Sequence, residues 1–303
     1  MRYLALAVLF ISATALGGCS GGVFDPQGPI AAAERLIMLN ATGIMLAIVI
    51  PTILATLGMA YWYRSSNSRA RYLPEFNYSG RVEMLVWSIP LMTILLTGGV
   101  TWISSYDLDP PKPLASAVKP VRVQVVSLDW KWLFIYPDEG IASVNHLTVP
   151  AGTPISFELT SAGVMNSFFV PQLAGQIYTM AGMVTRLNLQ ADHPGTYRGM
   201  SSNYSGAGFS DMYFNVDAVP AERFAQWVAA TRTAGPVLDA QTYADLVKPS
   251  QAVAPYTYRA VAMGLFSGIT KLEFVSTDPS PHTDHVSTEP SPHTHHAAQR
   301  ADK

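Results

Sequence analysis

Two long stretches without a charged side chain constrain this sequence more than any other feature. They cover residues 36–63 and 84–106. An α-helix rises about 1.5 Å per residue and the hydrocarbon core of a bilayer is about 30 Å thick, so each stretch can cross a membrane as a helix. Only 13% of the residues are charged, about half the share in a typical soluble domain. We therefore expect a transmembrane helix hairpin at residues 36–106.

The loop between the two stretches indicates which way the hairpin faces. It carries Arg64, Arg69, Arg71 and Arg81, with one acid, Glu75, before the last of them. Cytoplasmic loops of membrane proteins are enriched in Lys and Arg, so this loop is expected in the cytoplasm. Both ends of the hairpin then emerge on the outer side, and the chain that follows the second span lies outside the cytoplasmic membrane.

The N-terminus has the pattern of a secretory signal. Arg2 precedes an apolar run, Leu4–Leu16, that is too short to span a bilayer. The run ends in Leu-Gly-Gly before Cys19, as in the bacterial lipobox, where the Cys receives a diacylglycerol. We expect residues 1–18 to be a lipoprotein signal peptide and residues 19–35 a lipid-anchored tether. The alternatives are an ordinary signal with a chance cysteine, or a third, uncleaved helix.

A proline-rich linker separates the second span from a region of short β-type runs. These runs alternate apolar and polar residues or are rich in aromatic residues, and turns separate them. Strands at such spacing without helices between them favour a β-sandwich or a small barrel, which we place at residues 107–219. The predicted strands cover residues 121–125, 132–136, 155–159, 185–189 and 212–216.

The C-terminal part changes character twice. From Ala221 the apolar residues recur with a helical period, and a second short helix is expected at 239–247, so residues 220–275 are predicted to be a helical extension. Residues 276–303 hold a repeated Pro, Ser, Thr and His pattern with five of the seven histidines. Such a composition cannot bury a core and predicts a disordered tail, with weak metal binding as the alternative.

Three features resemble one family over about residues 25–275. They are the two spans, the aromatic run Asp129-Trp130-Lys131-Trp132, and Pro194-Gly195-Thr196-Tyr197 followed by a loop rich in Gly and Ser. Together they resemble subunit II of the haem-copper respiratory oxidases. The resemblance implies a two-helix transmembrane hairpin followed by a cupredoxin-like β-sandwich with a C-terminal helical extension.

In the cytochrome c oxidases of that family, this domain holds a dinuclear copper centre. The resemblance implies where its ligands would fall here, and only the Met is retained. Two coppers must be bridged by soft anionic sulfur, whereas the only cysteine of this chain is Cys19. We therefore expect no metal on this chain. Asn166 and Phe209 stand at the two His positions, Ser201 and Ser205 at the two Cys positions, Asn203 at the backbone carbonyl and Met212 at the Met.

The lost ligands, the lipobox and the stretch Met165–Pro171 resemble subunit II of the cytochrome o-type ubiquinol oxidases. The resemblance implies a complex that oxidises ubiquinol, reduces O₂ to water and pumps protons. Haems and the remaining copper belong to subunit I, so this chain is a non-catalytic subunit without a redox centre. Its expected partners are subunit I, smaller membrane subunits and lipid, but not cytochrome c. Its expected place is the bacterial inner membrane, with the main domain on the periplasmic side.

A rival hypothesis is a stand-alone inner-membrane lipoprotein whose cupredoxin domain acts in copper handling or oxidase assembly. The lost ligands argue against copper handling, and the hairpin argues for a fixed membrane partner. A cytochrome c oxidase subunit is excluded by the cysteine count. The net charge of −2 gives no reason to expect a nucleic acid partner.

A few further side chains invite a functional interpretation. Glu83 starts the second span on the cytoplasmic side and is a candidate for proton uptake, as the resemblance implies, or else an interfacial acid that is solvated or paired with Arg81. We expect Trp130 and Trp132 to pack at the interface with subunit I. Met165, Met180, Met183 and Met200 could suggest copper binding through thioethers, but without His or Cys nearby we expect them to fill the core. The histidines before the tail, His146 and His193, are expected to face solvent at turns.

Overall fold

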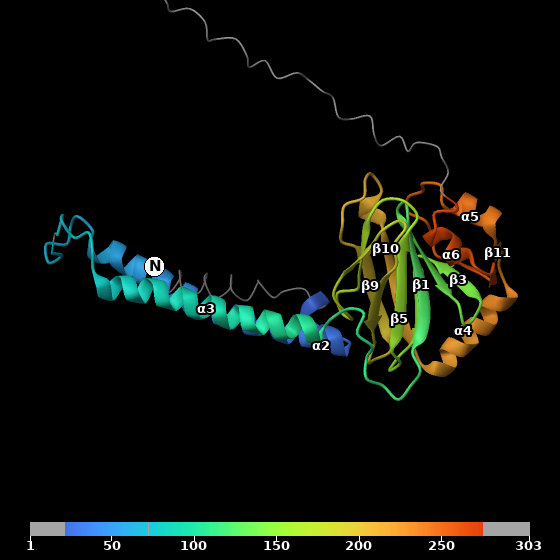
Figure 1. Ribbon diagram of the computed structural model, residues 1–303, viewed down its shortest axis with the longest axis horizontal. Helices are drawn as coiled ribbons and strands as arrows, with labels where there is room; N and C mark the ends of the chain where they lie inside the picture. The colour runs from blue at the N-terminus through green and yellow to red at the C-terminus, as the bar shows by residue number, and fades with distance from the viewer. Residues whose placement is uncertain (1–21, 72, 275–303) are drawn as a thin grey trace, which may run out of the picture.

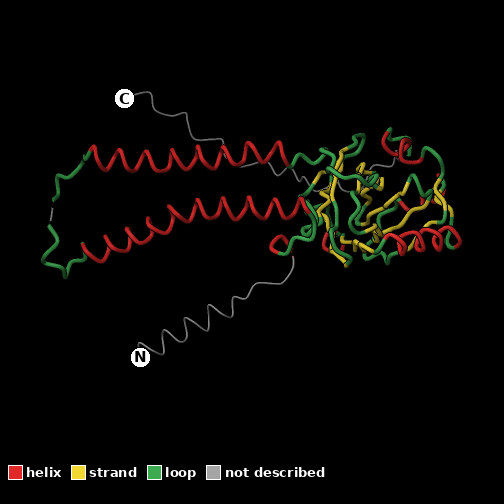
Figure 2. The backbone as a smooth tube through the Cα atoms, turned by 90° about the horizontal axis from the view of Figure 1, so that it is seen from below, coloured by secondary structure: helices red, strands yellow, loops and turns green. Residues whose placement is uncertain are grey.

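The computed structural model describes residues 22–71 and 73–274, which form a helix hairpin and a β domain (Figures 1 and 2). The hairpin consists of α2 (Pro29–Trp62) and α3 (Gly80–Asp107). Cys19 and the predicted tail at 276–303 lie outside the described residues. A short 3₁₀ turn, η1 (Gly22–Phe24), precedes α2.

The two helices of the hairpin confirm the two predicted spans. Both are long and apolar enough to cross a membrane, and they run side by side away from the β domain (Figure 2). Ala31 is the only buried residue of α2, and α3 has none within this chain. A helix that is apolar all round but uncovered needs lipid or other subunits around it.

The first helix begins earlier than the sequence pattern predicted. It starts at Pro29, whereas we expected a tether up to residue 35. Proline fits the first helical position because its fixed φ suits the helix and its missing N–H would have no partner there. The charged pair Glu34 and Arg35 therefore belongs to the helix, just before its uncharged stretch.

The β domain is a sandwich of two sheets. Most strand pairs are antiparallel, but β1 pairs with β5 and β10 pairs with β4 in parallel. The predicted strands are confirmed as β1, β2, β5, β8 and β10. The first sheet has the order β12-β3-β2-β1-β5-β8, with β12 (Tyr256–Tyr258), β3 (Ile141–Val144), β2 (Lys131–Tyr136), β1 (Val121–Leu128), β5 (Ile155–Ser161) and β8 (Thr185–Leu189). The second has the order β4-β10-β9-β6-β7, with β4 (His146–Pro150), β10 (Tyr213–Val219), β9 (Gly195–Ser201), β6 (Asn166–Phe169) and β7 (Ile177–Thr179).

An aromatic cluster fills the space between the sheets. Phe168 and Phe214 stack with ring centroids 5.1 Å apart, and the edge of Trp132 meets both rings at 5.5 Å. All three side chains are at most 1% exposed. Gly199 makes room for the cluster, because a Cβ there would lie 2.1 Å from the Phe214 ring.

The C-terminal segment confirms the two predicted helices as α4 (Ala221–Thr233) and α5 (Ala240–Leu246), although it also contains short strands that were not predicted. These strands are β11 (Val237–Leu238), β12 and β13 (Ala260–Val261), and the short helix α6 (Leu265–Thr270) follows them. Strands of two or three residues are too short to show a period in the sequence. The segment lies on the side of the domain away from the hairpin, and residues of β11, α5 and α6 cover the outer face of the first sheet (Figure 1).

A short strap before α2, residues 25–28, ties the hairpin to the base of the domain. The backbone N–H of Gln27 donates to the Gln172 carbonyl at 2.7 Å, and the Asp192 N–H donates to the Gln27 carbonyl at 2.8 Å. The Ala31 N–H adds a bond to the Leu173 carbonyl at 3.3 Å. Residues 25–28, which belong to the predicted lipid-anchored tether, are therefore fixed on the sandwich.

Candidate functional site

Strand pairing brings together the six positions at which the copper ligands of the resembling family would fall. Asn166 begins β6, and Ser201 ends β9, which pairs with β6. The chain then forms a loop over residues 202–212 and returns as β10. Met212 closes the loop, since the Ser201 N–H donates to its carbonyl at 3.1 Å. The loop carries the remaining three positions, Asn203, Ser205 and Phe209.

The polar groups at these positions bond to one another. The Ser201 Oγ lies 3.1 Å from the Asn166 Oδ1 and 3.2 Å from the Asn203 carbonyl oxygen. The Ser205 Oγ lies 3.9 Å from the Met212 sulfur. Asn166 is 1% exposed and Ser201 5%, so these bonds satisfy groups that water cannot reach. The arrangement closes this end of the sandwich with neutral hydrogen bonds.

Phe209 occupies the remaining position with a side chain that has no lone pair. It opens a 3₁₀ turn, η2 (Phe209–Asp211), and its ring meets the edge of Tyr204 at 5.5 Å. This contact shapes the tip of the loop. Tyr204 itself is 75% exposed.

The donor set at this end does not fit a dinuclear copper centre. It offers an amide, two hydroxyls, a phenyl ring, a backbone carbonyl and one thioether, whereas such a centre needs bridging thiolates and imidazoles. The full sequence has a single cysteine, far from this loop in the chain. Among residues 22–71 and 73–274, no three His, Cys, Asp or Glu side chains lie close enough to hold a metal ion. No step through such a centre follows from these residues.

The two tryptophans of the aromatic run are buried inside this chain, which corrects the expected interface with another subunit. Trp132 is fully buried in the central cluster, and Trp130 is 7% exposed. The Trp130 Nε1 donates to the Ser205 carbonyl at 3.0 Å. A Cβ at Gly208 would lie 2.5 Å from the Trp130 ring, so this glycine lets the loop lie on the indole. The Trp130 ring therefore packs against the loop at 202–212 and holds it in place.

Lys131 is a functional candidate that sequence reasoning missed. It is 2% exposed, and its Nζ donates to the Lys248 carbonyl at 2.7 Å and to the Ser250 Oγ at 2.6 Å. Burial lowers the pKa of this ammonium group to about 8, and the charge of Asp129 opposes the shift. A lysine between two tryptophans on a buried strand was the available signal. Through these two hydrogen bonds, Lys131 fastens the C-terminal segment to strand β2 of the first sheet.

Lys131 is expected to make stability depend on pH. In the unfolded chain its pKa is about 10.4, so between pH 8 and that value the unfolded state binds more protons. The free energy of unfolding should then rise with pH from about 8 to 9.5, below the range where tyrosines ionise. Below pH 8 the cost of the buried charge is fully present. Denaturation of the full chain in detergent, followed by tryptophan fluorescence, should show this rise, and Lys131→Met should abolish it. An equal rise in both chains would contradict the assignment.

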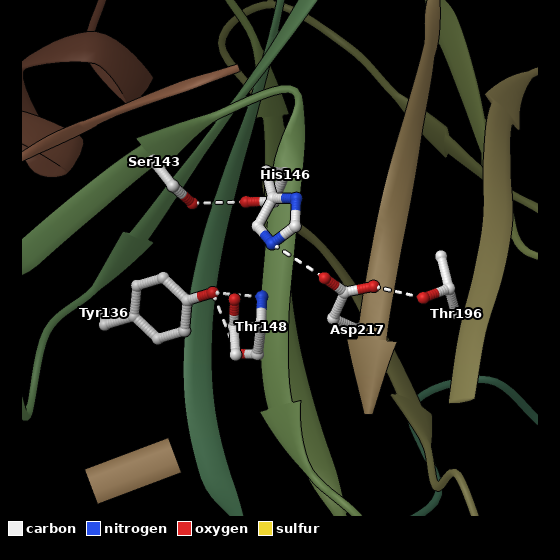
Figure 3. Close-up of polar contacts among 6 residues, drawn as sticks. All are labelled: Tyr136, Ser143, His146, Thr148, Thr196 and Asp217. Atoms are coloured by element: carbon white, nitrogen blue, oxygen red, sulfur yellow. Dashed lines mark hydrogen bonds and ion pairs between the residues drawn. The ribbon is translucent and has the colours of Figure 1, made fainter. Parts of the chain in front are cut away.

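The two histidines outside the tail behave differently. His193 lies exposed at a bend, as predicted. His146 instead begins β4, where its Nε2 lies 3.1 Å from the Asp217 Oδ2, while the Thr196 hydroxyl donates to the other oxygen at 2.6 Å (Figure 3). The turn precedes it at Asn145, which has a positive φ of 53°. Because the carboxylate stands between the hydroxyl and the imidazole, the histidine cannot activate Thr196 as a nucleophile.

Two further predictions concern single side chains. Glu83 lies in the first turn of α3, and α3 begins at the end of the hairpin that is farthest from the β domain (Figure 1). It is exposed, and within the described ranges it forms no ion pair, so the considered pair with Arg81 is absent. The methionines do not all fill the core: Met165 is 43% and Met183 54% exposed.

Two family profiles match the β domain and the C-terminal segment. The family profile "Cytochrome C oxidase subunit II, periplasmic domain" matches residues 139–219, and "COX Aromatic Rich Motif" matches residues 232–271. The periplasmic domain of subunit II of cytochrome oxidase from Bradyrhizobium japonicum is similar to 38% of this chain and 96% of its own, with 23% identity and a TM-score of 0.36.

Two relatives match most of the chain. The cytochrome bo(3) ubiquinol oxidase subunit 2 of Pseudomonas aeruginosa is 47% identical over 274 residues, covering 90% of this chain and 82% of the relative. The ubiquinol oxidase subunit 2 of Acetobacter aceti is 47% identical over 260 residues, covering 85% of this chain and 84% of the relative. The similarity therefore includes both the hairpin and the β domain.

Proposed function

The chain belongs to the family of ubiquinol oxidase subunit 2, and on this premise we propose that it is the non-catalytic second subunit of a proton-pumping terminal oxidase. The observation that carries the proposal is the end of the sandwich, where the six positions converge but Asn166, Ser201, Ser205 and Phe209 offer no copper ligands. Electrons then cannot pass through this domain from a soluble carrier. They reach the haems of subunit I from ubiquinol. Two ubiquinol molecules supply the four electrons that reduce one O₂ to two water molecules.

The role of this chain is to clamp and cover subunit I. Apolar side chains around the loop at 202–212 are unusually exposed for a protein surrounded by water, and a patch of this kind marks an interaction site. The side chains lie on neighbouring segments, since the Asn203 amide donates to the Met165 carbonyl at 3.1 Å. We assign this patch to contact with subunit I. Its members are Val164, Met165, Tyr178, Met183, Val184 and Tyr204, each at least 43% exposed.

The proposed location is the bacterial inner membrane, with the β domain in the periplasm and a lipid on Cys19. The arginines of the hairpin loop support this orientation. Gln27 is fixed at the base of the domain, and Cys19 lies eight positions before it in the sequence, a reach of at most about 28 Å. A lipid on Cys19 can therefore enter the leaflet that the domain faces.

Purification tests the proposed function. Gentle solubilisation should bring the chain down with a larger haem protein that oxidises ubiquinol and leaves reduced cytochrome c untouched. Mass spectrometry of the same complex should find a chain that begins at a diacylated Cys19. A chain that runs alone and without haem would instead support the stand-alone lipoprotein. Oxidation of cytochrome c by the complex would overturn the assigned electron donor.

Glu83 is proposed to take part in proton uptake from the cytoplasm. It is exposed and unpaired within the described ranges, at the cytoplasmic start of α3, and so is open to protons from water. We expect Glu83→Gln to slow ubiquinol oxidation by the complex severalfold at unchanged haem content, because the amide cannot carry a proton. Oxygen consumption measures the rate, and Glu75→Gln, in the loop before α3, is the control. Equal rates in both variants would mean that Glu83 is a solvated acid with no part in proton uptake.

A further inference from the structure

A cavity of about 410 Å³ lies between the hairpin and the β domain. The outer ends of both helices, the linker after α3 and the domain all contribute to its walls. Its volume is in the range of sites that hold small molecules. The six converging positions lie outside its lining, so the cavity is a separate feature.

The cavity lies at the level of the membrane surface. Glu34 lines it from α2, two residues before the uncharged stretch begins at Leu36. Asp107 lines it from α3, directly after the uncharged stretch ends. Just inside, in the last two turns of the uncharged stretch, Trp102 and Tyr106 pack edge to face at 5.4 Å, as aromatic residues do at the boundary of a bilayer. Lipid headgroups therefore surround this part of the protein.

The walls carry charges of both signs, with the carboxylates of Glu34, Asp107 and Asp109 and the ammonium group of Lys112. The Gly175 N–H donates to the Glu34 carboxylate, and a Cβ at Gly175 would lie 2.5 Å from a Glu34 oxygen, so the carboxylate is held against this backbone. On the linker side, the Lys112 ammonium lies 3.7 Å from an Asp107 oxygen. This distance is long for an ion pair, and Lys112 keeps donors for another anion.

The remaining walls are apolar and rigid. Ile30, Leu108, Leu114 and Leu187 provide hydrocarbon surface beside the charged groups. Asn188 fixes the linker to the domain, because its N–H donates to the Pro110 carbonyl at 3.0 Å and its side-chain amide donates to the Pro111 carbonyl at 2.9 Å. A cavity built this way suits a molecule with an amine, an anionic group and an apolar part.

We propose that this cavity binds the headgroup of a membrane phospholipid that carries a primary amine. The ammonium group donates to Glu34, the phosphate accepts from Lys112, and the glycerol backbone lies along the leucines. A trimethylated amine has no N–H to donate, and a headgroup without an amine leaves Glu34 without a counter-charge next to a phosphate. The inference goes beyond the proposed function, because it does not depend on which donor supplies electrons.

Native mass spectrometry of the assembled oxidase tests this site. The purified complex is stripped of lipid and then offered phosphatidylethanolamine, phosphatidylcholine or phosphatidylglycerol in detergent. The wild type should retain phosphatidylethanolamine best. Glu34→Gln should lower that retention by about tenfold, the loss expected for one charge-assisted hydrogen bond. Glu222→Gln, an exposed acid on α4, should change nothing.

Lys112→Met provides a second arm that leaves the packing of α2 intact. It should weaken retention of phosphatidylethanolamine and phosphatidylcholine alike, since both carry the phosphate. If Glu34→Gln fails to assemble, this variant still decides the matter. Equal retention of all three lipids, or full retention of phosphatidylethanolamine by Lys112→Met, would overturn the proposal.

Discussion

A chain in which Asn166 and Phe209 become His, and Ser201 and Ser205 become Cys, is expected to bind two copper ions. The backbone already places these positions at one site, since the Ser201 Oγ lies 3.2 Å from the Asn203 carbonyl and the Ser205 Oγ 3.9 Å from the Met212 sulfur. Cysteine is close to serine in shape, so two thiolates can take the same places. Two bridging thiolates, two imidazoles, the thioether and the carbonyl would then complete the ligand set of the resembling family.

The measurement is copper content per chain, together with the visible absorption that thiolate-bound copper adds. The fourfold variant should rise from no bound copper to two ions per chain. The matched control moves one cysteine by a single residue, with Ser202→Cys in place of Ser201→Cys. The Ser202 Oγ instead bonds to the Ser167 Oγ at 2.9 Å, on the other face of the strand, so this variant should not bridge two ions. Equal copper in both variants would show that the six positions do not form the site.

Much of the candidate site could be predicted from the sequence because it depends on chemical identity. A single cysteine excludes bridged copper whatever the fold. The hydrogen bonds that replace the ligands could not be predicted, because they depend on the pairing of β6 with β9 across more than thirty residues of chain. For the same reason Trp130 and Trp132 could be identified as aromatic residues on one strand, but not as buried by the loop and by the second sheet.

The fold was predictable where one face of a strand is solvated and alternation appears. β5, with polar Ser156 and Glu158 between apolar residues, is such a case. β2 and β3 are buried along their whole length because the C-terminal elements cover the outer face of their sheet. Their sequences therefore show no alternation of polar and apolar residues that would mark where each strand begins and ends. Short strands such as β6, with four residues, carry too few positions for any pattern.

The joint between hairpin and domain was the least predictable part, and Gly28 is its most sensitive residue. It is buried, and a Cβ there would lie 2.1 Å from the Gln190 carbonyl oxygen and 3.3 Å from that of Leu173. Both neighbours are backbone atoms, which cannot rotate away. The sequence around Gly28 gives no signal of this contact, because a glycine before a proline fits a flexible linker equally well.

Gly28→Val is therefore expected to detach the strap from the domain without unfolding the sandwich. Loss of the three backbone hydrogen bonds of Gln27, Asp192 and Ala31 should cost about 3 kcal/mol, at about 1 kcal/mol each. The hairpin and the domain would then be joined on one side only, by the linker after α3, and a subunit that must contact its partner with both parts should assemble poorly. We expect protease cleavage near Gln27 and a large loss of haem protein that copurifies with the chain. Gly43→Val, in α2 with nothing within 4 Å of its Cβ, is the control. Normal assembly and an uncut strap in Gly28→Val would mean that the domain is positioned by subunit I rather than by its own N-terminal strap.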